Sequence, residues 1–190
     1  DGDPEKAVYH SVLVANASND EINSIEDIKG KTMAFVDPDS TSGNLVPAMD
    51  IIHAFPDEEL NSDKLHTNGD FLEAVSYSGS HQAGLQAVIK GDVDVVPISD
   101  QILASEIANG NAKDSDVKII HESDAIPAEG MVVAESVDED TKKMLTDFLT
   151  SYDNEAYFTD VIKKEGARFV ECSAEDYEPI VELNKTLNQE

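Results

Sequence analysis

The sequence predicts an α/β fold with a mostly parallel sheet flanked by helices. Short apolar runs typical of buried strands alternate with amphipathic helical patterns, and this alternation favours right-handed βαβ crossovers. The run VDVVPI at 93–98 is nearly continuously apolar, as expected for a strand that is covered on both faces. The 190 residues are enough for one domain or two small lobes with a buried core.

Two strands and two helices are predicted in the first part of the chain. Residues 7–15 are predicted to form a strand in which Tyr9 and Ser11 alternate with Val8 and Val12, and a short capped helix at 24–28 is predicted to end at Gly30. A strand at 33–36 leads into a helix whose apolar residues recur at positions 45, 49 and 52, which is helical spacing. Together these last two elements form the first βα unit.

The polar stretch 60–71 is predicted to be irregular, and a second βα unit follows it. This unit has a strand at 73–78 and a helix at 82–90 that Gly91 ends. The remaining elements are predicted, in order, as a helix at 101–108, strands at 117–121 and 131–134, and helices at 138–151, 155–165 and 174–188.

The composition is strongly acidic, because 40 acidic residues against 13 basic ones give a net charge of -27. A nucleic-acid partner is not expected, since a phosphate backbone needs Lys and Arg to displace its counterions. The acidic residues are spread along the chain, which indicates a uniformly solvated surface. Such a surface repels itself less in concentrated salt, where the Debye length shrinks to about 3 Å at 1 M, and this favours a halophilic source.

Other features of the composition limit the kinds of site that the chain could hold. Cys172 is the single cysteine, so neither a disulfide nor a cysteine metal site is predicted. No apolar run approaches the roughly 20 residues of a membrane span. The chain lacks the H-E-x-x-H and Walker patterns, and Ser40 is not in a G-x-S-x-G elbow, so an enzyme is not expected.

The turn Asp37-Pro-Asp-Ser-Thr-Ser-Gly43 lies between a predicted strand and a predicted helix. The first N–H groups of a helix have no partner inside it and attract anions. Ser40, Thr41 and Ser42 add hydroxyl donors, and Gly43 lets the backbone approach a bound oxyanion closely. An ordinary N-cap without a ligand explains the same residues and stays open as the alternative.

A second turn, Ser78-Gly-Ser-His81, follows the next predicted strand. The carboxyl ends of neighbouring parallel strands meet at one sheet edge, where ligands bind in open α/β sheets. His81 is therefore predicted to be a second donor to the same anion. A surface histidine or a helix cap is the alternative for this residue.

These two turns are part of a wider sequence similarity to a known protein family. The sequence resembles the substrate-binding proteins of phosphonate and related phosphate or phosphite ABC transporters, which are periplasmic binding proteins of type II. The similarity runs from about Tyr9 to the mid-140s. It is carried by Tyr9–Val12, Ser24–Lys31, Asp37–Pro47, Ser78–His81, Gly91–Asp94 and Ala125–Pro127.

The resemblance implies a two-lobed clamshell that closes on a phosphonate, phosphite or phosphate ion and delivers it to an ABC permease. It implies no cofactor and an extracytoplasmic location, in the periplasm or at the cell surface, with an anchor in the full-length protein. The ligand contacts carry over to Tyr9, Ser40, Thr41, Ser42 and His81.

Family members that take aminophosphonates hold the amine with two acidic residues, which by position fall on Asp100 and Glu129. This chain has Pro-Ala-Glu-Gly around Glu129 where the family more often has an aspartate followed by a proline. The family also has on the order of a hundred residues before the Tyr9 strand, which is the size of a lobe.

The expected organisation follows from that comparison. We expect a polar start and hinge strand at 1–10, a complete α/β lobe with the anion site at 11–123, and a returning hinge with a partial second lobe at 124–190. Such a chain would be a truncated protein or a fragment that pairs with another chain. A ligand-sensing receptor domain of the same fold and a fragment that no longer binds are the two alternatives to a transport function.

Overall fold

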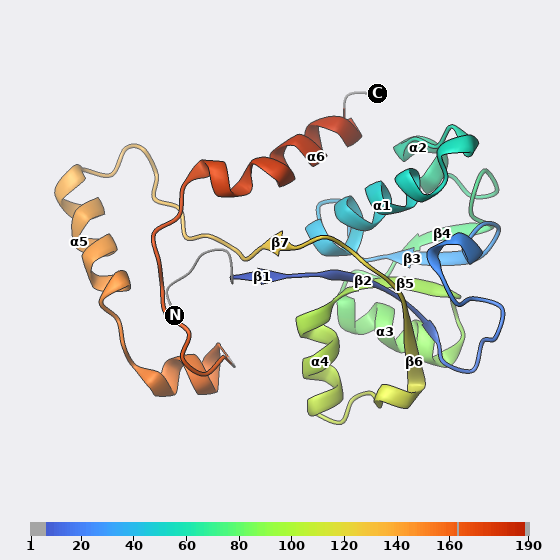
Figure 1. Cartoon of the computed structure of the whole chain (residues 1–190), viewed down its shortest axis with the longest axis horizontal. Coiled ribbons are helices and arrows are strands. Elements are labelled where there is room, and N and C mark those ends of the chain that lie inside the picture. The colour runs from blue at the N-terminus through green and yellow to red at the C-terminus, as the bar shows by residue number, and fades with distance from the viewer. Residues whose placement is uncertain (1–6, 163, 189–190) are drawn as a thin grey trace. The chain divides into compact units, whose positions relative to one another are not determined.

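The computed structural model describes residues 7–162 and 164–188 (Figure 1). The described residues divide into two compact units. The sheet unit comprises residues 9–126 and 179–188, and the C-terminal unit comprises residues 7–8 and 127–178. The division falls inside both strands of a two-stranded sheet, which pairs β1 with β7. These strands are β1 (Val8–Tyr9) and β7 (Ile126–Pro127).

The sheet unit is built on a five-stranded sheet with strand order β4-β3-β5-β2-β6. Its strands are β2 (Ser11–Asn16), β3 (Thr32–Phe35), β4 (Ala74–Tyr77), β5 (Val95–Ser99) and β6 (Val117–Glu122). β3 runs parallel to β4 and β5, whereas β2 runs antiparallel to β5 and β6. The predicted mostly parallel sheet is confirmed, with β2 as the one reversed strand.

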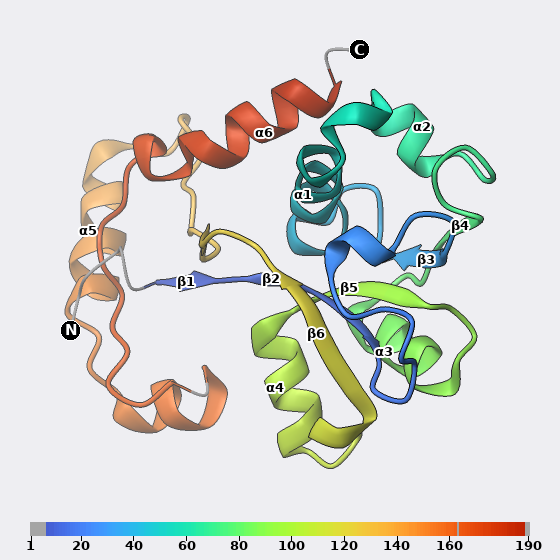
Figure 2. The same cartoon turned by 45° about the vertical axis from the view of Figure 1, so that its right-hand side comes forward.

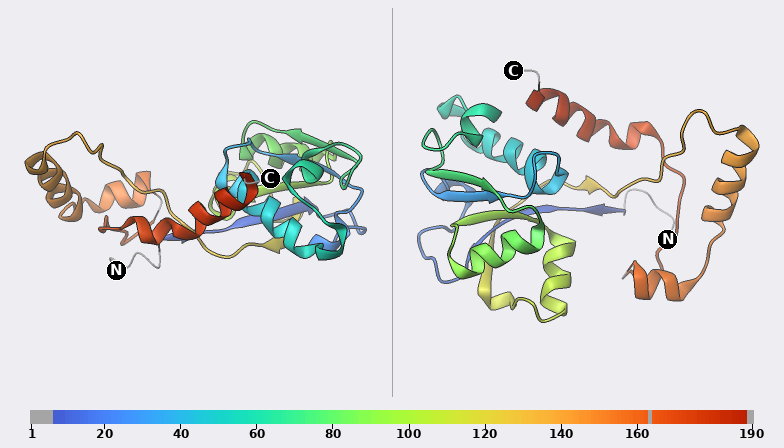
Figure 3. Two further views of the ribbon diagram at one scale, coloured as in Figure 1. Left: turned by 90° about the horizontal axis from the view of Figure 1, so that it is seen from above. Right: turned by 180° about the vertical axis from the view of Figure 1, so that it is seen from behind.

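Helices cover both faces of this sheet, with α1 and α2 on one side and α3 and α4 on the other (Figures 2 and 3). The longer helices are α1 (Val46–Ala54), α3 (His81–Lys90) and α4 (Asp100–Ala108). The short elements are α2 (Ser62–His66), three 3-10 turns at Ile25–Asp27, Pro56–Glu58 and Asp114–Asp116, and a π-helical turn at Thr41–Leu45.

Each face of the sheet packs into its own apolar cluster. Successive side chains of a strand point to opposite faces, so Leu13 of β2 joins a cluster with Phe35 and Ile51, while Val12 joins a cluster with Leu85 on the other face. Both faces of β2 are therefore buried. This explains why the strand is almost continuously apolar and why its direction cannot be read from its sequence.

Two predicted elements were wrong. The stretch 60–71 is not wholly irregular, because Asn61 caps the one-turn helix α2 by accepting a hydrogen bond from the Lys64 N–H. A single turn is too short to show helical periodicity. Residues 131–134 are not a strand, and 94% of Val132 is exposed. The apolar run there has no partner strand within the described residues.

The C-terminal unit contains α5 (Glu139–Thr150), a π-helical turn at Tyr157–Val161 and a 3-10 turn at Ala174–Tyr177, and α6 (Glu178–Asn188) begins at its end. Phe158 is the one buried hydrophobic residue within the described part of this unit. The helix predicted at 155–165 includes residue 163, which lies outside the described residues. None of the described helices is long and apolar enough to cross a bilayer.

Candidate anion-binding site

Three strands of the sheet unit end at one edge, and each leads into a helical segment. β3 is followed by the π-helical turn and α1, β4 by α3, and β5 by α4. These three strands are parallel, so their carboxyl ends and the helix starts after them share that edge. The predicted site residues at 40–42, 81 and 100 all follow these strand ends.

The hydroxyl turn, defined here as residues 37–43, has one tightly specified shape. Ser40 caps the helical turn, since its Oγ accepts a hydrogen bond of 3.1 Å from the Gly43 N–H. A Cβ atom built on Gly43 would lie 2.4 Å from Cβ of Val36, so only glycine fits there. Ser42 is buried, and its carbonyl oxygen accepts a 2.7 Å hydrogen bond from Oγ of Ser11. The backbone of the turn is thus fixed at both ends.

The turn leaves two of its hydroxyl groups available. Within the described residues, the hydroxyl groups of Thr41 and Ser42 make no hydrogen bond to another protein group. In the described part of the chain, every buried side-chain nitrogen or oxygen atom has a hydrogen-bond partner. The hydroxyl oxygen of Ser42 has none, so it must be accessible to solvent. Both hydroxyl groups can therefore donate to a ligand at the solvent side of the turn.

The two predicted turns meet at the end of β3. The N–H group of Val36 donates to the Gly43 carbonyl at 2.9 Å, and the Val36 carbonyl accepts from the Gly79 N–H at 2.9 Å. A hydrogen bond of 2.8 Å from the Ser78 N–H to the Phe35 carbonyl extends the same pairing. The hydroxyl turn and the 78–81 turn are consequently hydrogen-bonded to the same residue.

His81 is the first residue of α3 and is partly buried. Its Nδ1 accepts a 3.3 Å hydrogen bond from the N–H of Ser99, at the end of β5. Burial lowers the pKa of His81 below 6.5, while the nearby Pro97 carbonyl acts in the opposite direction. A neutral ring that accepts at Nδ1 carries its proton on Nε2, so Nε2–H is the group that can donate to an anion.

The three remaining predicted contacts are Asp100, which follows β5 at the same edge, Tyr9 and Glu129. Asp100 begins α4, and its Oδ1 accepts hydrogen bonds from the N–H groups of His10 (3.0 Å) and Gln101 (2.8 Å). Tyr9 is half-buried in β1. Glu129 is exposed and belongs to the C-terminal unit. The roles of all seven predicted site residues remain predictions.

Sequence reasoning missed the buried polar residues that support this edge. Besides Ser42, these are Ser11, Asn44, Ser99 and Ser123. Oγ of Ser123 accepts a 3.0 Å hydrogen bond from the Ser11 N–H, and Ser11 in turn holds the Ser42 carbonyl. A serine at the start or end of an apolar strand was the available signal. Among the described residues, no three His, Cys, Asp or Glu side chains are grouped so that they could hold a metal ion.

Comparison with known proteins identifies the family to which the chain belongs. Residues 1–177 match the family described as "ABC transporter, phosphonate, periplasmic substrate-binding protein". The chain belongs to this family. The family consists of substrate-binding proteins and is not a class of enzymes. The resemblance stated from the sequence is thereby confirmed.

Two curated relatives show the extent of the similarity. The chain is 33% identical over 121 residues to the phosphate-import protein PhnD of Mycolicibacterium smegmatis, covering 62% of this chain and 36% of the relative. It is 30% identical over 156 residues to the phosphonates-binding periplasmic protein of Escherichia coli, covering 80% of this chain and 42% of the relative. The chain thus spans well under half the length of these relatives.

Solved structures confirm the type II periplasmic-binding-protein fold. A binding protein component of an ABC phosphonate transporter from Pseudomonas aeruginosa has a TM-score of 0.73 at 24% identity, over 94% of this chain and 57% of that one. PhnD1 from Prochlorococcus marinus, solved in complex with methylphosphonate, has a TM-score of 0.72 at 20% identity, over 97% of this chain and 68% of that one. At these identities the likeness concerns the fold.

Proposed function

We propose that this chain is part of the solute-binding component of an ABC importer, which captures a phosphonate or a related phosphorus oxyanion and delivers it to a membrane permease. One observation carries the proposal. The hydroxyl turn and the His81 turn are both hydrogen-bonded to Val36, so the free hydroxyl groups of Thr41 and Ser42 and the Nε2–H group of His81 come from neighbouring strand ends. Membership of the family supports the same function.

The donors of this site are neutral, since the hydroxyl turn contains no Lys or Arg. Hydrogen bonds to a charged group contribute roughly 1.5 to 3 kcal/mol each. Four or five of them, after the loss of translational and rotational freedom, are enough for micromolar binding at about -8 kcal/mol. Neutral donors also suit a carrier, because no fixed positive charge opposes release of the anion to the permease.

Calorimetry on two variants tests the site. We expect Thr41→Ala and His81→Ala each to weaken binding of methylphosphonate by about 1 to 3 kcal/mol, because each leaves part of the anion without a donor. Thr67→Ala is the matched control, since Thr67 is exposed and its hydroxyl donates only to the Asp63 carbonyl four residues earlier. Wild-type affinity in both site variants would refute the site, and no binding by the unmodified chain would favour a non-binding fragment.

Ligand choice within this class rests on the two acidic residues. We propose that Asp100 and Glu129 select an aminophosphonate by holding its ammonium group. Glu129→Gln should then weaken binding of 2-aminoethylphosphonate more than binding of phosphate. Equal losses for the two ligands would refute this role. A thermal-shift comparison of alkylphosphonate, aminophosphonate, phosphite and phosphate would identify the preferred anion.

We further propose an extracytoplasmic location with an anchor in the full-length protein, and a halophilic source. Family membership supports the location, and the net charge of -27 supports the source. Mutual repulsion of the acidic residues should weaken as salt shortens the Debye length from about 10 Å at 0.1 M to about 3 Å at 1 M. Unfolding measured from 0.1 to 2 M KCl should therefore show rising stability, and a flat profile would contradict the halophilic source.

A further inference from the structure

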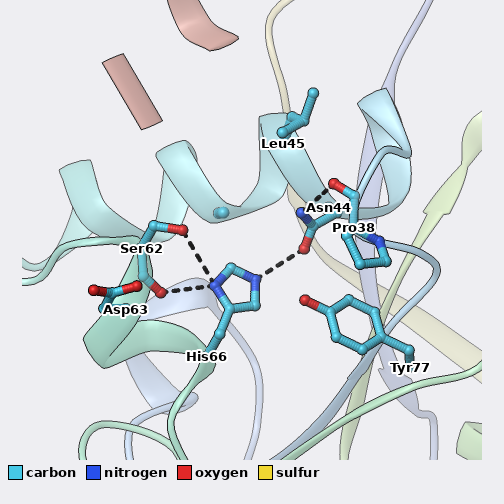
Figure 4. A pocket seen from close by; sticks show the side chains of 8 residues that line it. Pro38, Asn44, Leu45, Ser62, Asp63, His66 and Tyr77 are labelled. Atoms are coloured by element: carbon cyan, nitrogen blue, oxygen red, sulfur yellow. Dashed lines mark hydrogen bonds between the residues drawn. The ribbon is translucent and has the colours of Figure 1, made fainter. Parts of the chain in front are cut away.

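A small cavity lies behind the hydroxyl turn, on the side of the sheet that carries α1 and α2 (Figure 4). Its volume is about 240 Å³. The imidazole of His66, at the end of α2, points to Asn44 across the cavity, and the ring of Tyr77 lies beside it (Figure 4). The cavity is lined by Pro38, Asn44, Leu45, Ala48, Ser62, Asp63, His66 and Tyr77.

A chain of three hydrogen bonds runs through this group. Nδ1 of His66 lies 2.7 Å from the Ser62 carbonyl oxygen, and Nε2 lies 2.8 Å from Oδ1 of Asn44. Nδ2 of Asn44 donates to the Pro38 carbonyl at 2.9 Å. Asn44 is buried, and Pro38 and Asn44 flank the three hydroxyl residues. The chain therefore ties both sides of the hydroxyl turn to α2.

Counting donors along this chain shows which protonation state of the His66 ring satisfies all three hydrogen bonds. A backbone carbonyl can only accept, so Nδ1 must carry a proton to bond Ser62. The amide of Asn44 must direct its NH2 group at the Pro38 carbonyl, so Oδ1 faces Nε2, and Nε2 must also carry a proton. All three bonds form together only when His66 is an imidazolium ion.

Each neutral tautomer of the His66 ring loses one of these three hydrogen bonds. If Nδ1 is deprotonated, its lone pair faces the Ser62 carbonyl at 2.7 Å, and the Ser62 hydroxyl, at 3.5 Å, is too distant to replace the bond well. If Nε2 is deprotonated, the Asn44 amide must turn over to donate to it, which directs its oxygen at the Pro38 carbonyl. Loss of the His66 proton thus loosens the link between α2 and the turn.

The surroundings of the ring suit a cation. The ring centroid of Phe35 is 4.6 Å from that of His66, within the range of a cation–π contact. Tyr77 of β4 stacks at 6.3 Å with an interplanar angle of 10°, and burial and the charge of Asp37 raise its pKa, so its phenol stays neutral. Asp63 on α2 also lines the cavity, whereas the π-helical turn contributes the uncharged Leu45 and α1 the uncharged Ala48.

We propose that His66 is a positioning residue that holds the hydroxyl turn in its anion-binding shape, and that it does so as an imidazolium ion. The inference rests on the proposed function and deepens it, because it names the side chain that holds Pro38 and Asn44 on either side of Thr41 and Ser42. An anion bound by Thr41 and Ser42 would favour protonation of His66, and protonation would favour binding by the same factor, since the two equilibria are linked.

Nuclear magnetic resonance of the whole chain tests the positioning role without any ligand. With ring nitrogens labelled with nitrogen-15, both nitrogens of His66 should be protonated at pH 5.5. The backbone amide signals of Thr41, Ser42 and Asn44 should shift as His66 loses its proton. In His66→Gln these amide shifts should disappear, whereas in His53→Gln they should remain. His53 is the matched control because it is an exposed histidine on the neighbouring helix α1.

Titration with methylphosphonate then tests the coupling. Between pH 5.5 and 8.5, the Kd of the wild type should rise at least about fivefold more than the Kd of His66→Gln. Ionisation of the ligand and of His81 affects both proteins alike and cancels in this ratio. A neutral His66 at pH 5.5, or turn amides that ignore its titration, would overturn the inference. Failure of the unmodified chain to bind any anion would refute the proposed function, while the ligand-free spectra would still decide the role of His66.

Discussion

The sheet unit and the C-terminal unit differ in how they bury their apolar residues. In the sheet unit, two apolar clusters cover the two faces of the sheet, and Leu13, Leu85 and Ile98 are at most 1% exposed. In the C-terminal unit, α5 leaves Met144 62% and Phe148 59% exposed. Apolar side chains that remain in water contribute no burial energy. The sheet unit therefore carries its own core, and the hydroxyl turn and the His81 turn both belong to it.

The largest effect is expected from a matched pair of leucines, one in each unit. Leu85→Ala in α3 removes a fully buried side chain and should lower the free energy of unfolding by about 2 to 5 kcal/mol. Leu145→Ala in α5 removes a side chain that is 38% exposed and should change it by less than about 1 kcal/mol. Urea unfolding followed by circular dichroism measures both. Equal losses would show that α5 has a core of its own and would remove the contrast.

A pair of glycines makes a sharper comparison, because the space at each is filled by a different kind of atom. At Gly43 an added Cβ would meet Cβ of Val36 at 2.4 Å, and the backbone of Val36 is held by hydrogen bonds to Gly43 and Gly79. At Gly130 an added Cβ would meet the hydroxyl of Tyr177 at 2.6 Å, which is the far end of a side chain that can turn away.

Gly43→Ala should consequently destabilise the protein by about 1 to 3 kcal/mol, as overpacking does, and should also abolish anion binding by displacing the hydroxyl turn. Gly130→Ala should have a smaller effect on stability. Thermal unfolding and calorimetry with methylphosphonate measure the two consequences separately. Normal binding of methylphosphonate by Gly43→Ala would contradict this prediction, because it would mean that the hydroxyl turn keeps its binding shape with a Cβ atom at position 43.

The same contrast explains how much of the fold could be predicted from the sequence. In the sheet unit, the apolar run of β5 and the boundaries of α3, capped by Ser80 and ended by Gly91, are local signals that packing reinforces. In the C-terminal unit, the apolar run at 131–134 gives a similar local signal, but no neighbouring strand pairs with it in the described residues. A strand needs a partner, and the identity of the partner is not a local property of the sequence.

The candidate site also combines features that the sequence could predict with features that it could not. The serine-rich turn and the histidine turn could be predicted, because their hydroxyl, glycine and imidazole groups lie within a few consecutive residues. The partnership of Asn44 and His66 could not, since it joins residues 22 positions apart, and α2 is one turn long. The support given by Ser11 to Ser42 depends on the reversed direction of β2, which brings its first residue opposite the last residue of β5.

The smallest effect, and the most specific, is a difference in pH dependence between the units. Burial lowers the pKa of His81 below 6.5, so the unfolded chain binds more protons than the folded one as the pH falls through that region. Stability should therefore decrease on acidification from pH 7 towards the folded pKa of His81.

In the C-terminal unit, hydrogen bonds from the Gly166 N–H and from Arg168 lower the pKa of Glu155 below 4.5. Its contribution should be complete above pH 4.5 and lost only at lower pH.

Unfolding measured from pH 3 to 8 in His81→Gln and Glu155→Gln separates these two contributions. His81→Gln should flatten the profile just below pH 6.5, whereas Glu155→Gln should alter it only below pH 4.5, and more weakly, because Glu155 is exposed and screened by solvent. Protonation of His81 would also direct an Nδ1–H group at the Ser99 N–H, so the loss of stability and the loss of anion binding should share one midpoint. Separate midpoints would mean that the Ser99 contact does not set the orientation of the ring on which the candidate site depends.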